Sequence, residues 1–248
     1  MFNFFAENEA RQNSKYIIEG NDYNHIKNVL RMESGDRCLI SCAGKSDLCQ
    51  IEGFTNNSVI LEILEEDYTD TELPVKIYLF QGLPKGDKME YIIQKCVELG
   101  VYSIMPVEMK HCIVKLDGKK AAAKQARWQG ISESAAKQSK RNIIPEILEV
   151  TPYSKALEFA KTLDLILVPY ENEEGMKATA EALADLKNVK SVGIFIGPEG
   201  GFEKAEIEKA LVADAKIISL GKRILRTETA AITAVGLAML NIELGSNE

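Results

Sequence analysis

Three short segments after predicted strands hold the residue types that could bind a ligand and act on it. The first is Gly197-Pro198-Glu199-Gly200-Gly201, whose three glycines let the backbone approach a ligand closely. It matches neither the G-x-x-x-x-G-K-S/T nor the G-x-G-x-x-G spacing of phosphate-binding loops. Because Glu199 would repel a pyrophosphate, the loop suits a neutral or cationic ligand better. A tight strand-to-helix turn with a solvated Glu199 is the structural alternative.

The second segment, Leu220–Thr229, combines a turn, a cation and a helix start. Gly221 permits a tight turn, Thr227 is expected to N-cap the last helix, and Glu228 suits the positive end of that helix. Arg226 lies just before the helix, where a cation opposes the helix dipole. This mild penalty suggests a functional role, such as binding an anion or polarising an oxygen.

The third segment, Pro169-Tyr170-Glu171, also follows a predicted strand, and a parallel sheet would bring all three segments together. After Pro74, strands and helices alternate, which predicts an α/β fold with helices on both faces of such a sheet. The expected strands are Val75–Phe80, Tyr102–Val107, Asp164–Val168, Ser191–Ile196 and Lys216–Ser219. The expected helices are Asp87–Leu99 with Gly100 at C′, Lys119–Lys140, Tyr153–Thr162, Gly175–Leu186, Glu203–Ala213 and Thr227–Leu244. Ligands bind beyond the carboxyl ends of the strands in such sheets.

The first part of the chain has a different pattern, with short predicted strands separated by turns. This pattern predicts a small β-barrel. The expected strands are Phe2–Phe5, Lys15–Glu19, Arg37–Cys42, Leu48–Phe54 and Val59–Leu64. One short helix is expected over Asp22–Arg31, with Asp22 as its N-cap. The acidic stretch Glu65–Leu73, closed by Pro74, reads as a linker. We therefore predict two domains, over residues 1–68 and 74–248.

Composition places the chain among ordinary globular proteins. Of its 248 residues, 46% are hydrophobic and 27% are charged, which excludes disordered, collagen-like and disulfide-scaffold classes. No apolar run approaches the roughly 20 residues that span a bilayer, and the N-terminus lacks the basic region of a signal peptide. We therefore expect a soluble, cytoplasmic protein with no membrane partner. The last helix is apolar on nearly all sides, so either the core or a second copy of the chain must cover it.

The cysteines and histidines give little support for a metal site. Cys38, Cys42 and Cys49 cluster in the sequence, but with C-x3-C-x6-C spacing and with only His25 nearby. Small buried residues on strands are the better interpretation, and the odd number of cysteines fits a reduced compartment. Because the chain has two histidines, we expect neither a His-based metal site nor Ser-His-Asp catalysis.

Charge is distributed unevenly along the chain. The net charge of −7 argues by itself against a nucleic-acid partner. Lys110–Arg141, however, holds nine basic and two acidic residues, whereas Glu62–Glu72 holds six acidic and no basic residues. The basic segment is either a solvated helix face or a phosphate-binding patch on an otherwise acidic protein.

Two motifs in the C-terminal half are highly specific: Ile196-Gly197-Pro198-Glu199-Gly200-Gly201-Phe202 and Leu220-Gly221-x-Arg223-Ile224-Leu225-Arg226-x-Glu228-Thr229-Ala230. Weaker matches are His25-x-x-x-Val29-Leu30-Arg31 with Gly35-Asp36, Lys95-x-x-Glu98-Leu99-Gly100-Val101, and Glu133-Ser134-Ala135-Ala136-Lys137-Gln138-Ser139-x-Arg141-x-x-x-Pro145. Through them, essentially the whole sequence resembles the RsmE family. These are uracil-N3-methyltransferases of 16S ribosomal RNA, in the small subunit, and belong to the SPOUT superfamily.

The resemblance implies S-adenosyl-L-methionine as the methyl donor, a PUA-like N-terminal barrel, a C-terminal trefoil knot and a homodimer. It implies that the donor is bound by Leu167, Pro169, Tyr170, Ile196, Gly197, Pro198, Glu199, Gly200, Gly201, Leu220, Gly221, Ile224 and Leu225. The sequence departs from the family at Asn3 and His111, where arginine is common. Both positions are plausible RNA contacts, so the RNA footprint follows less directly from the resemblance than the donor site does.

Methyl transfer to N3 of uracil defines what the candidate catalytic residues must do. The N3 proton must leave, so the reaction needs a base, or a cation that stabilises the oxygen that becomes negative. Arg226 is the candidate cation, and Glu199 and Glu228 are alternative bases. The transfer needs no metal ion. We expect 16S ribosomal RNA or the small subunit to bind through Arg31, Lys137, Gln138, Lys140 and Arg141.

Two other functions stay open at this point. One is a ribose 2′-O-methyltransferase of the same superfamily, which needs no N3 deprotonation. The other is a non-catalytic RNA-binding module of ribosome assembly that does not bind the donor.

Overall fold

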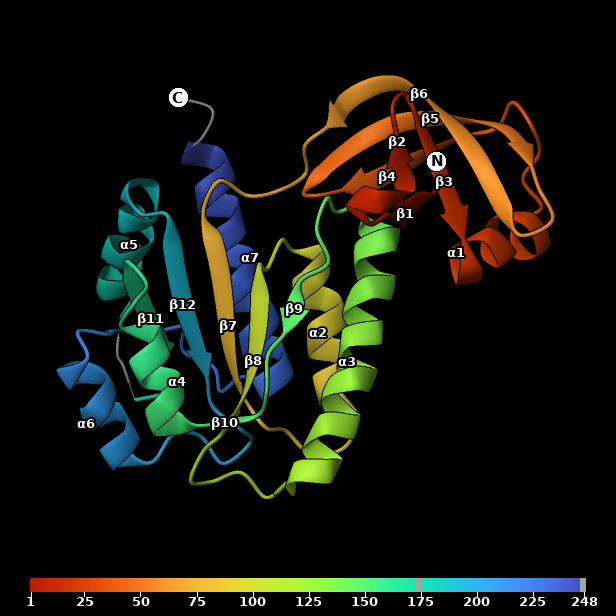
Figure 1. The fold of residues 1–248 in the computed structure, drawn as a ribbon. Coiled ribbons are helices and arrows are strands. Elements are labelled where there is room, and N and C mark those ends of the chain that lie inside the picture. The colour runs from red at the N-terminus through yellow and green to blue at the C-terminus, as the bar shows by residue number, and fades with distance from the viewer. Residues whose placement is uncertain (173–174, 246–248) are drawn as a thin grey trace. The chain divides into compact units, whose positions relative to one another are not determined.

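The computed structural model describes residues 1–172 and 175–245, and divides the chain into two compact units. The N-terminal unit comprises Met1–Glu72 together with Ala136–Ile144, and the C-terminal unit comprises Leu73–Ala135 and the chain from Pro145 onward. Figure 1 labels the elements of both units. Ala136–Ile144 thus belongs to the unit formed by the first residues of the chain, although it is distant from them in sequence.

The N-terminal unit is built on a six-stranded sheet with the order β1-β4-β5-β6-β3-β2. The strands are β1 (Asn3–Phe5), β2 (Arg11–Gln12), β3 (Lys15–Glu19), β4 (Arg37–Cys42), β5 (Lys45–Phe54) and β6 (Ser58–Thr69), and a 3-10 turn, η1, covers Asn8–Ala10. β1 pairs with β4 in parallel and the other pairs are antiparallel. β6 continues to Thr69 because Glu65 and Thr69 pair with β5, so this part of the expected linker is strand.

The three clustered cysteines lie in or beside the core of this sheet. Cys38 and Cys49 are fully buried among side chains such as Phe4 and Ile40, and Cys42 is buried at the edge of the same cluster. Burial raises the pKa of the Cys38 thiol to about 12 and moves the pKa of Cys49 in the same direction. All are free thiols, which confirms their interpretation as buried residues on strands.

The helix expected over Asp22–Arg31 is broken into two turns. α1 covers Gly20–Asn24 and a π-helical turn, η2, covers His25–Val29. The helix begins two residues before Asp22, so the expected N-cap is wrong. The Asp22 carboxylate instead accepts a hydrogen bond from Lys137 Nζ at 2.8 Å. Arg31 follows η2 with a φ of +54°, a left-handed conformation that ends the helical segment.

The C-terminal unit has the parallel sheet that the alternating pattern predicts, in the order β10-β8-β7-β12-β11-β13, with β9 also paired to β8. Its strands are β7 (Lys76–Gly82), β8 (Ser103–Glu108), β9 (Glu146–Ile147), β10 (Thr151–Pro152), β11 (Leu165–Pro169), β12 (Ser191–Ile196) and β13 (Lys216–Ile218). Its helical elements are α2 (Lys88–Glu98), α3 (Gly118–Ser139), α4 (Tyr153–Ala160), α5 (Lys177–Ala184), η3 (Asp185–Asn188), α6 (Lys204–Val212) and α7 (Thr227–Gly245). The last residues of α3, from Ala136, fall in the N-terminal unit.

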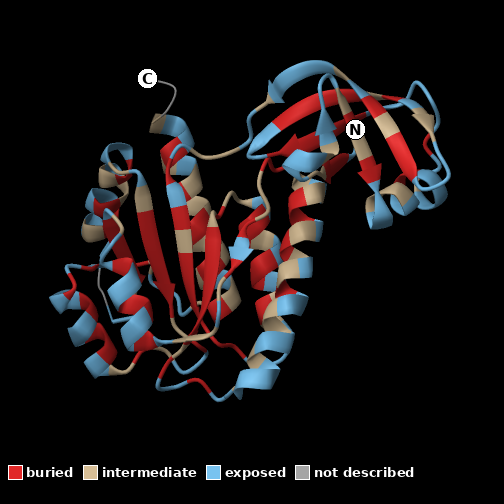
Figure 2. Cartoon of the chain, viewed as in Figure 1, coloured by how far each residue is buried: buried red, intermediate tan, exposed pale blue. Residues whose placement is uncertain are grey.

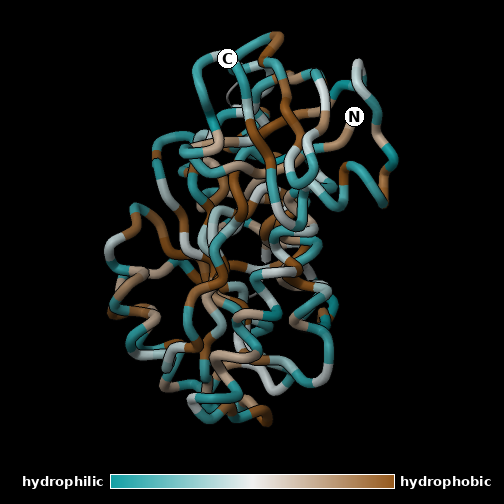
Figure 3. The backbone as a smooth tube through the Cα atoms, turned by 45° about the vertical axis from the view of Figure 1, so that its right-hand side comes forward, coloured by the Kyte–Doolittle hydropathy of each residue, from teal (hydrophilic) through white to brown (hydrophobic). Residues whose placement is uncertain are grey.

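The strands of this sheet are buried between helices on both faces (Figure 2). Hydrophobic stretches alternate with hydrophilic ones along the backbone (Figure 3). Phe80 of β7 stacks on Phe195 of β12 with ring centroids 4.3 Å apart. Gly193 lies against this stack, and a Cβ there would sit 2.9 Å from the Phe80 ring and 3.0 Å from Leu163. The core therefore leaves no room for a side chain at Gly193.

α7 is only partly covered by its own chain. Ala231, Val235 and Ile242 are buried, since α7 packs on α2, β7 and β12. Leu240 and Leu244 are exposed, and Leu237 is half-buried. Core packing alone therefore does not bury this apolar helix on all sides. None of the helices in the described part of the chain has the length and hydropathy to span a membrane.

Alanine at position 193 tests the packing of the sheet. We expect Gly193→Ala to lower the free energy of unfolding by about 1–3 kcal/mol, because the new methyl group overlaps the Phe80 ring. At Gly130 in α3, no described atom outside the neighbouring residues and the backbone of its own helix lies within 4 Å of the corresponding Cβ position. Gly130→Ala is therefore expected to stabilise the protein by up to about 1 kcal/mol. Calorimetric unfolding compares the two. Equal effects of the two substitutions would contradict the packing described.

Candidate functional site

The three segments singled out in the sequence meet around one cavity of about 520 Å³ in the C-terminal unit. This volume is typical of a small-molecule site. The cavity is lined by Lys88, Pro169, Tyr170, Glu171, Ile196, Gly197, Pro198, Glu199, Gly200, Gly201, Phe202, Ser219, Leu220, Gly221, Arg223, Ile224, Leu225, Arg226, Thr227 and Ala230. It lies where β11, β12 and β13 end, as expected for a parallel sheet.

The residues expected to bind a donor all line this cavity except Leu167. Leu167 is 1% exposed and pairs with both neighbours of β11 inside the sheet. β11 continues to Pro169, so the wall of the cavity begins two residues later than expected. Glu171, which was not among the expected donor contacts, does line the cavity. Its carboxylate lies 2.7 Å from the position a Cβ would take on Gly201.

The hydroxyl of Thr227 joins the glycine loop to the start of α7. It donates a hydrogen bond to the carbonyl oxygen of Gly197 at 2.7 Å and accepts one from Gln81 Nε2 at 2.9 Å. Thr227 was expected to cap its own helix, but its hydroxyl is used in these two contacts. Gln81 is fully buried and Thr227 is 5% exposed. One hydroxyl thus connects the end of β7, the loop after β12 and the first residue of α7.

The glycine loop is also held from a second side, by His111. Its Nδ1 lies 3.0 Å from the carbonyl oxygen of Gly200 and 3.3 Å from that of Gly201. A carbonyl oxygen only accepts, so Nδ1 is the protonated nitrogen in these contacts. A Cβ on Gly200 would sit 2.8 Å from the Cβ of His111. His111, a departure from the RsmE pattern, therefore supports the loop directly.

Lys88 lies between the two carboxylates proposed as bases. Its Nζ is 2.8 Å from Glu199 Oε1 and 3.6 Å from Glu228 Oε2, and the Lys85 N–H donates to the same Glu199 oxygen at 3.1 Å. Burial raises the pKa of Glu199, but the hydrogen bonds from Lys88 and Lys85 outweigh burial, and the pKa lies below its ordinary value. The hydrogen bond to Glu199 raises the pKa of Lys88.

The two carboxylates differ in their access to the cavity. Glu199 lines it, whereas Glu228 does not. The Glu228 side chain is 16% exposed, and its Oε2 accepts no hydrogen bond from the described residues although Lys88 Nζ lies 3.6 Å away. Glu228 therefore lies close to Lys88 but outside the lining of the cavity, so it does not contact a ligand there. This argues against its expected role as a base in direct contact with the substrate.

Arg226 lines the cavity with an exposed side chain. Within the described residues its guanidinium has no hydrogen bond or ion pair. A guanidinium without a protein partner can contact an oxygen atom of a molecule that binds next to a ligand in the cavity. Sequence reasoning identified Arg226 but missed Lys88, because Lys88 is 111 positions from Glu199 and belongs to a helix whose pattern showed only an amphipathic face.

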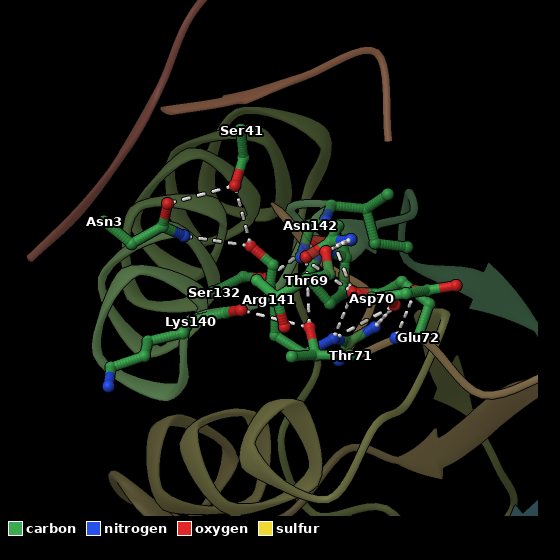
Figure 4. Close-up of polar contacts among 12 residues, drawn as sticks. Asn3, Ser41, Thr69, Asp70, Thr71, Glu72, Ser132, Lys140, Arg141 and Asn142 are labelled. Carbon is green, nitrogen blue, oxygen red and sulfur yellow. Dashed lines mark hydrogen bonds and ion pairs between the residues drawn. The ribbon is translucent and has the colours of Figure 1, made fainter. Parts of the chain in front are cut away.

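Arg141, expected to bind RNA phosphate, is instead a buried structural residue of the N-terminal unit (Figure 4). It is 3% exposed, and its guanidinium donates to both carboxylate oxygens of Glu72, from Nε at 2.8 Å and from Nη2 at 2.5 Å. Its carbonyl oxygen accepts a hydrogen bond from Asn3 Nδ2 at 3.0 Å. The expected phosphate contact by Arg141 is therefore wrong, and the buried Asn3 is a structural partner of Arg141.

The other expected RNA contacts are accessible in the same unit. Arg31, Gln138 and Lys140 are exposed, and Lys140 has a φ of +59° just after α3. Lys137 is half-buried in its ion pair with Asp22. Within the described residues, no group of three or more His, Cys, Asp and Glu side chains could hold a metal ion.

Two models of known protein families match this chain. A family model described as an RNA methyltransferase domain matches residues 71–239, and one described as an RNA methyltransferase PUA domain matches residues 18–64. The chain is therefore an RNA methyltransferase-domain protein with a PUA domain.

Curated relatives narrow the class to one family. The chain is 38% identical to ribosomal RNA small subunit methyltransferase E of Bacillus subtilis, over 92% of this chain and 91% of the relative. It is 35% identical to the protein of the same name from Mesomycoplasma hyopneumoniae, over 94% and 96% of the two chains. The chain belongs to the ribosomal RNA small subunit methyltransferase E family, which confirms the resemblance to RsmE.

Solved structures agree in fold over nearly the whole chain. Ribosomal RNA small subunit methyltransferase E of Neisseria gonorrhoeae, bound to S-adenosyl methionine, superposes with a TM-score of 0.79 at 34% identity, and covers 95% of this chain and 96% of its own. A Legionella pneumophila protein in complex with the bound cofactor SAM gives a TM-score of 0.82 at 31% identity, over 96% and 97% of the two chains.

The pairing of Glu199 predicts a pH-dependent stability. A carboxyl group whose pKa is lowered by folding stabilises the protein above its unfolded pKa and loses this effect as pH falls through the folded pKa. We expect Glu199→Gln to lower the free energy of unfolding by about 1–2 kcal/mol at pH 7. The difference from wild type should shrink as pH falls below 4.5, the ordinary pKa of the group.

Urea unfolding of both proteins between pH 7 and pH 3 measures this difference. Glu181→Gln, which changes an exposed carboxylate on α5, is the matched control and should change stability little at any pH. A difference between wild type and Glu199→Gln that persists unchanged at pH 3 would show that Glu199 does not stabilise the fold as an ionised partner of Lys88.

Proposed function

We propose that this protein is an S-adenosyl-L-methionine-dependent methyltransferase that methylates N3 of a uridine in 16S ribosomal RNA of the small subunit. The observation that carries the proposal is the cavity in which the glycine loop and the segment before α7 face each other. Thr227 joins these two segments directly. Members of the same family supply the precedent for the donor and for the RNA.

The carboxylates around the cavity suit a donor that is a cation. Glu171 and Glu199 line it, as do the cations of Lys88, Arg223 and Arg226. The glycine loop offers backbone groups instead of the lysine and serine of a phosphate-binding loop. We propose that the donor is held by the lining residues named above from β11, the glycine loop and Leu220–Leu225. S-adenosylmethionine would supply a methyl group on a sulfonium. A nitrogen can attack this methyl carbon in line and displace the thioether, without a metal ion. The pocket contributes chiefly by holding the two reactants in line.

Arg226 is proposed to stabilise the uracil oxygen that becomes negative when the N3 proton leaves. It lines the cavity without a protein partner in the described structure, so its guanidinium can turn toward the base. Glu199 is the carboxylate at the cavity wall and is proposed to accept the proton. Its lowered pKa keeps it ionised at neutral pH but makes it a weak base. A nearby cation that stabilises the deprotonated uracil compensates for this weakness.

RNA is proposed to bind through the exposed basic residues of the N-terminal unit. Arg31 and Lys140 can contact phosphates, and Lys137 and Gln138 lie at the end of α3, just before Lys140. Such contacts position RNA without reading its sequence, and a splayed single-stranded base is the form in which N3 can be reached. Arg31 lies within residues 18–64, which match an RNA methyltransferase PUA domain, and this match supports the assignment of Arg31.

We further propose a homodimer, a C-terminal trefoil knot and a cytoplasmic location. The exposed Leu240 and Leu244 of α7 give a second copy of the chain an apolar surface to cover, which supports a homodimer. The C-terminal trefoil knot is proposed from membership of the family. The proposed ribosomal RNA substrate supports a cytoplasmic location of the reaction.

The site of methylation distinguishes this proposal from its alternatives. Ribosomal RNA from cells without the gene is incubated with the protein and donor, digested and examined by mass spectrometry. The proposal predicts 3-methyluridine. A ribose-methylated nucleoside would identify a 2′-O-methyltransferase instead. Absence of heat on calorimetric titration with S-adenosylmethionine would favour a non-catalytic RNA-binding module.

Arg226→Ala tests the role of the cation. We expect the methylation rate to fall by roughly 10²–10³-fold, while the dissociation constant for the donor changes only a few-fold, because Arg226 acts on the uracil oxygen. Single-turnover kinetics and calorimetry measure the two quantities. Lys222→Ala, an exposed neighbour outside the cavity, should leave both unchanged. Parallel losses of rate and donor affinity in Arg226→Ala would rule out the proposed role.

Lys140→Ala tests the RNA surface through the salt dependence of binding. Each lost phosphate contact reduces the slope of log K against log salt by about one. We expect this reduction for Lys140→Ala in filter-binding titrations, and no change for Lys177→Ala, which removes an exposed lysine from α5. A slope that Lys140→Ala leaves at the wild-type value would exclude Lys140 from the interface.

A further inference from the structure

Three charged side chains lie close together at the glycine loop: Lys88, Glu199 and Glu228. We call them the charge cluster, and it carries an excess of one negative charge. Lys88 Nζ lies 2.8 Å from Glu199 and 3.6 Å from Glu228. The side chains of Lys88, Glu199 and Glu228 are 33%, 27% and 16% exposed. Lys88 neutralises one of the two carboxylates, and the other remains uncompensated within the cluster.

The cluster is close enough to the cavity to act on a ligand in it. Lys88 and Glu199 both line the cavity, and Glu228 follows Thr227 in the first turn of α7. Among the described residues, the other charges on the cavity wall are those of Glu171, Arg223 and Arg226, all of them exposed. Water and salt screen exposed charges more effectively than part-buried ones, so the field of the cluster reaches further into the cavity.

Methyl transfer changes the charge of the donor by one unit. The carbon–sulfur bond breaks, sulfur keeps its electron pair, and a cationic sulfonium becomes a neutral thioether, while the new carbon–nitrogen bond forms with the N3 electron pair. A negatively charged cluster beside the cavity favours binding of the cation over binding of the thioether. Such a cluster would promote exchange of the product for fresh donor.

We propose that the charge cluster makes the cavity select the sulfonium donor over the thioether product, and that Lys88 sets the strength of this selection. The proposal rests on the donor assigned above. Lys88 is a specificity-determining residue in this account, because it holds Glu199 at the cavity wall and cancels one negative charge. Glu228 supplies the uncompensated charge without contacting the ligand.

Two substitutions that change the cluster charge in opposite directions test the proposal. Lys88→Met makes the cluster more negative by one unit, and Glu228→Gln makes it neutral with little change of shape. Calorimetry gives the dissociation constants of S-adenosylmethionine and S-adenosylhomocysteine, and their ratio measures the preference for the sulfonium. We expect a preference roughly tenfold larger in Lys88→Met and roughly tenfold smaller in Glu228→Gln. Sinefungin carries an ammonium in place of the sulfonium. Its dissociation constant should therefore change in each variant in the same direction as that of S-adenosylmethionine.

Lys88→Arg keeps the charge and is the matched control, with an expected preference within about twofold of wild type. Thermal unfolding of each variant confirms that it is folded. An unchanged ratio in folded Lys88→Met and Glu228→Gln, or a shift of both in the same direction, overturns the proposal. If the wild-type protein binds neither S-adenosylmethionine nor S-adenosylhomocysteine, the donor assignment itself fails, and that outcome is distinct from an unchanged ratio.

Discussion

The hydroxyl of Thr227 is the contact on which the site depends. It joins Gln81 at the end of β7 to the carbonyl oxygen of Gly197, and it does so from the first residue of α7. A buried polar group that loses its partner is costly, so this arrangement holds the glycine loop and the α7 segment in one relative position. The cavity exists because two segments that are separate in sequence are fixed together at this point.

The effect of each charged residue at the cavity depends on its partner and on its burial. Glu199 is held by Lys88 and the backbone, Glu228 stands behind Lys88, and Arg226 is left exposed at the wall. A part-buried negative cluster suits a cationic donor, and an exposed arginine suits an oxygen that gains charge during the reaction. The same protein uses another arginine, Arg141, in the opposite way, as a buried partner of Glu72.

Local pattern predicted much of the fold and of the site. The strand Ser191–Ile196 has its predicted bounds, and Gly100 ends α2 with a φ of +90°. Loops at strand ends were found because parallel strands bring their carboxyl ends to one edge. Partners across the fold could not be predicted. The charge of Arg141 was visible in sequence, but its partner Glu72 is 69 positions away, and Asp22 pairs with Lys137 instead of capping a helix.

The most direct measurement is a nuclear magnetic resonance titration of the ¹⁵N-labelled protein with S-adenosylmethionine. We expect the largest amide shifts on Gly197, Gly200 and Gly201 and on Leu220–Leu225, the two segments that Thr227 joins. Shifts confined to other parts of the chain, or no shifts at saturating donor, would contradict this expectation.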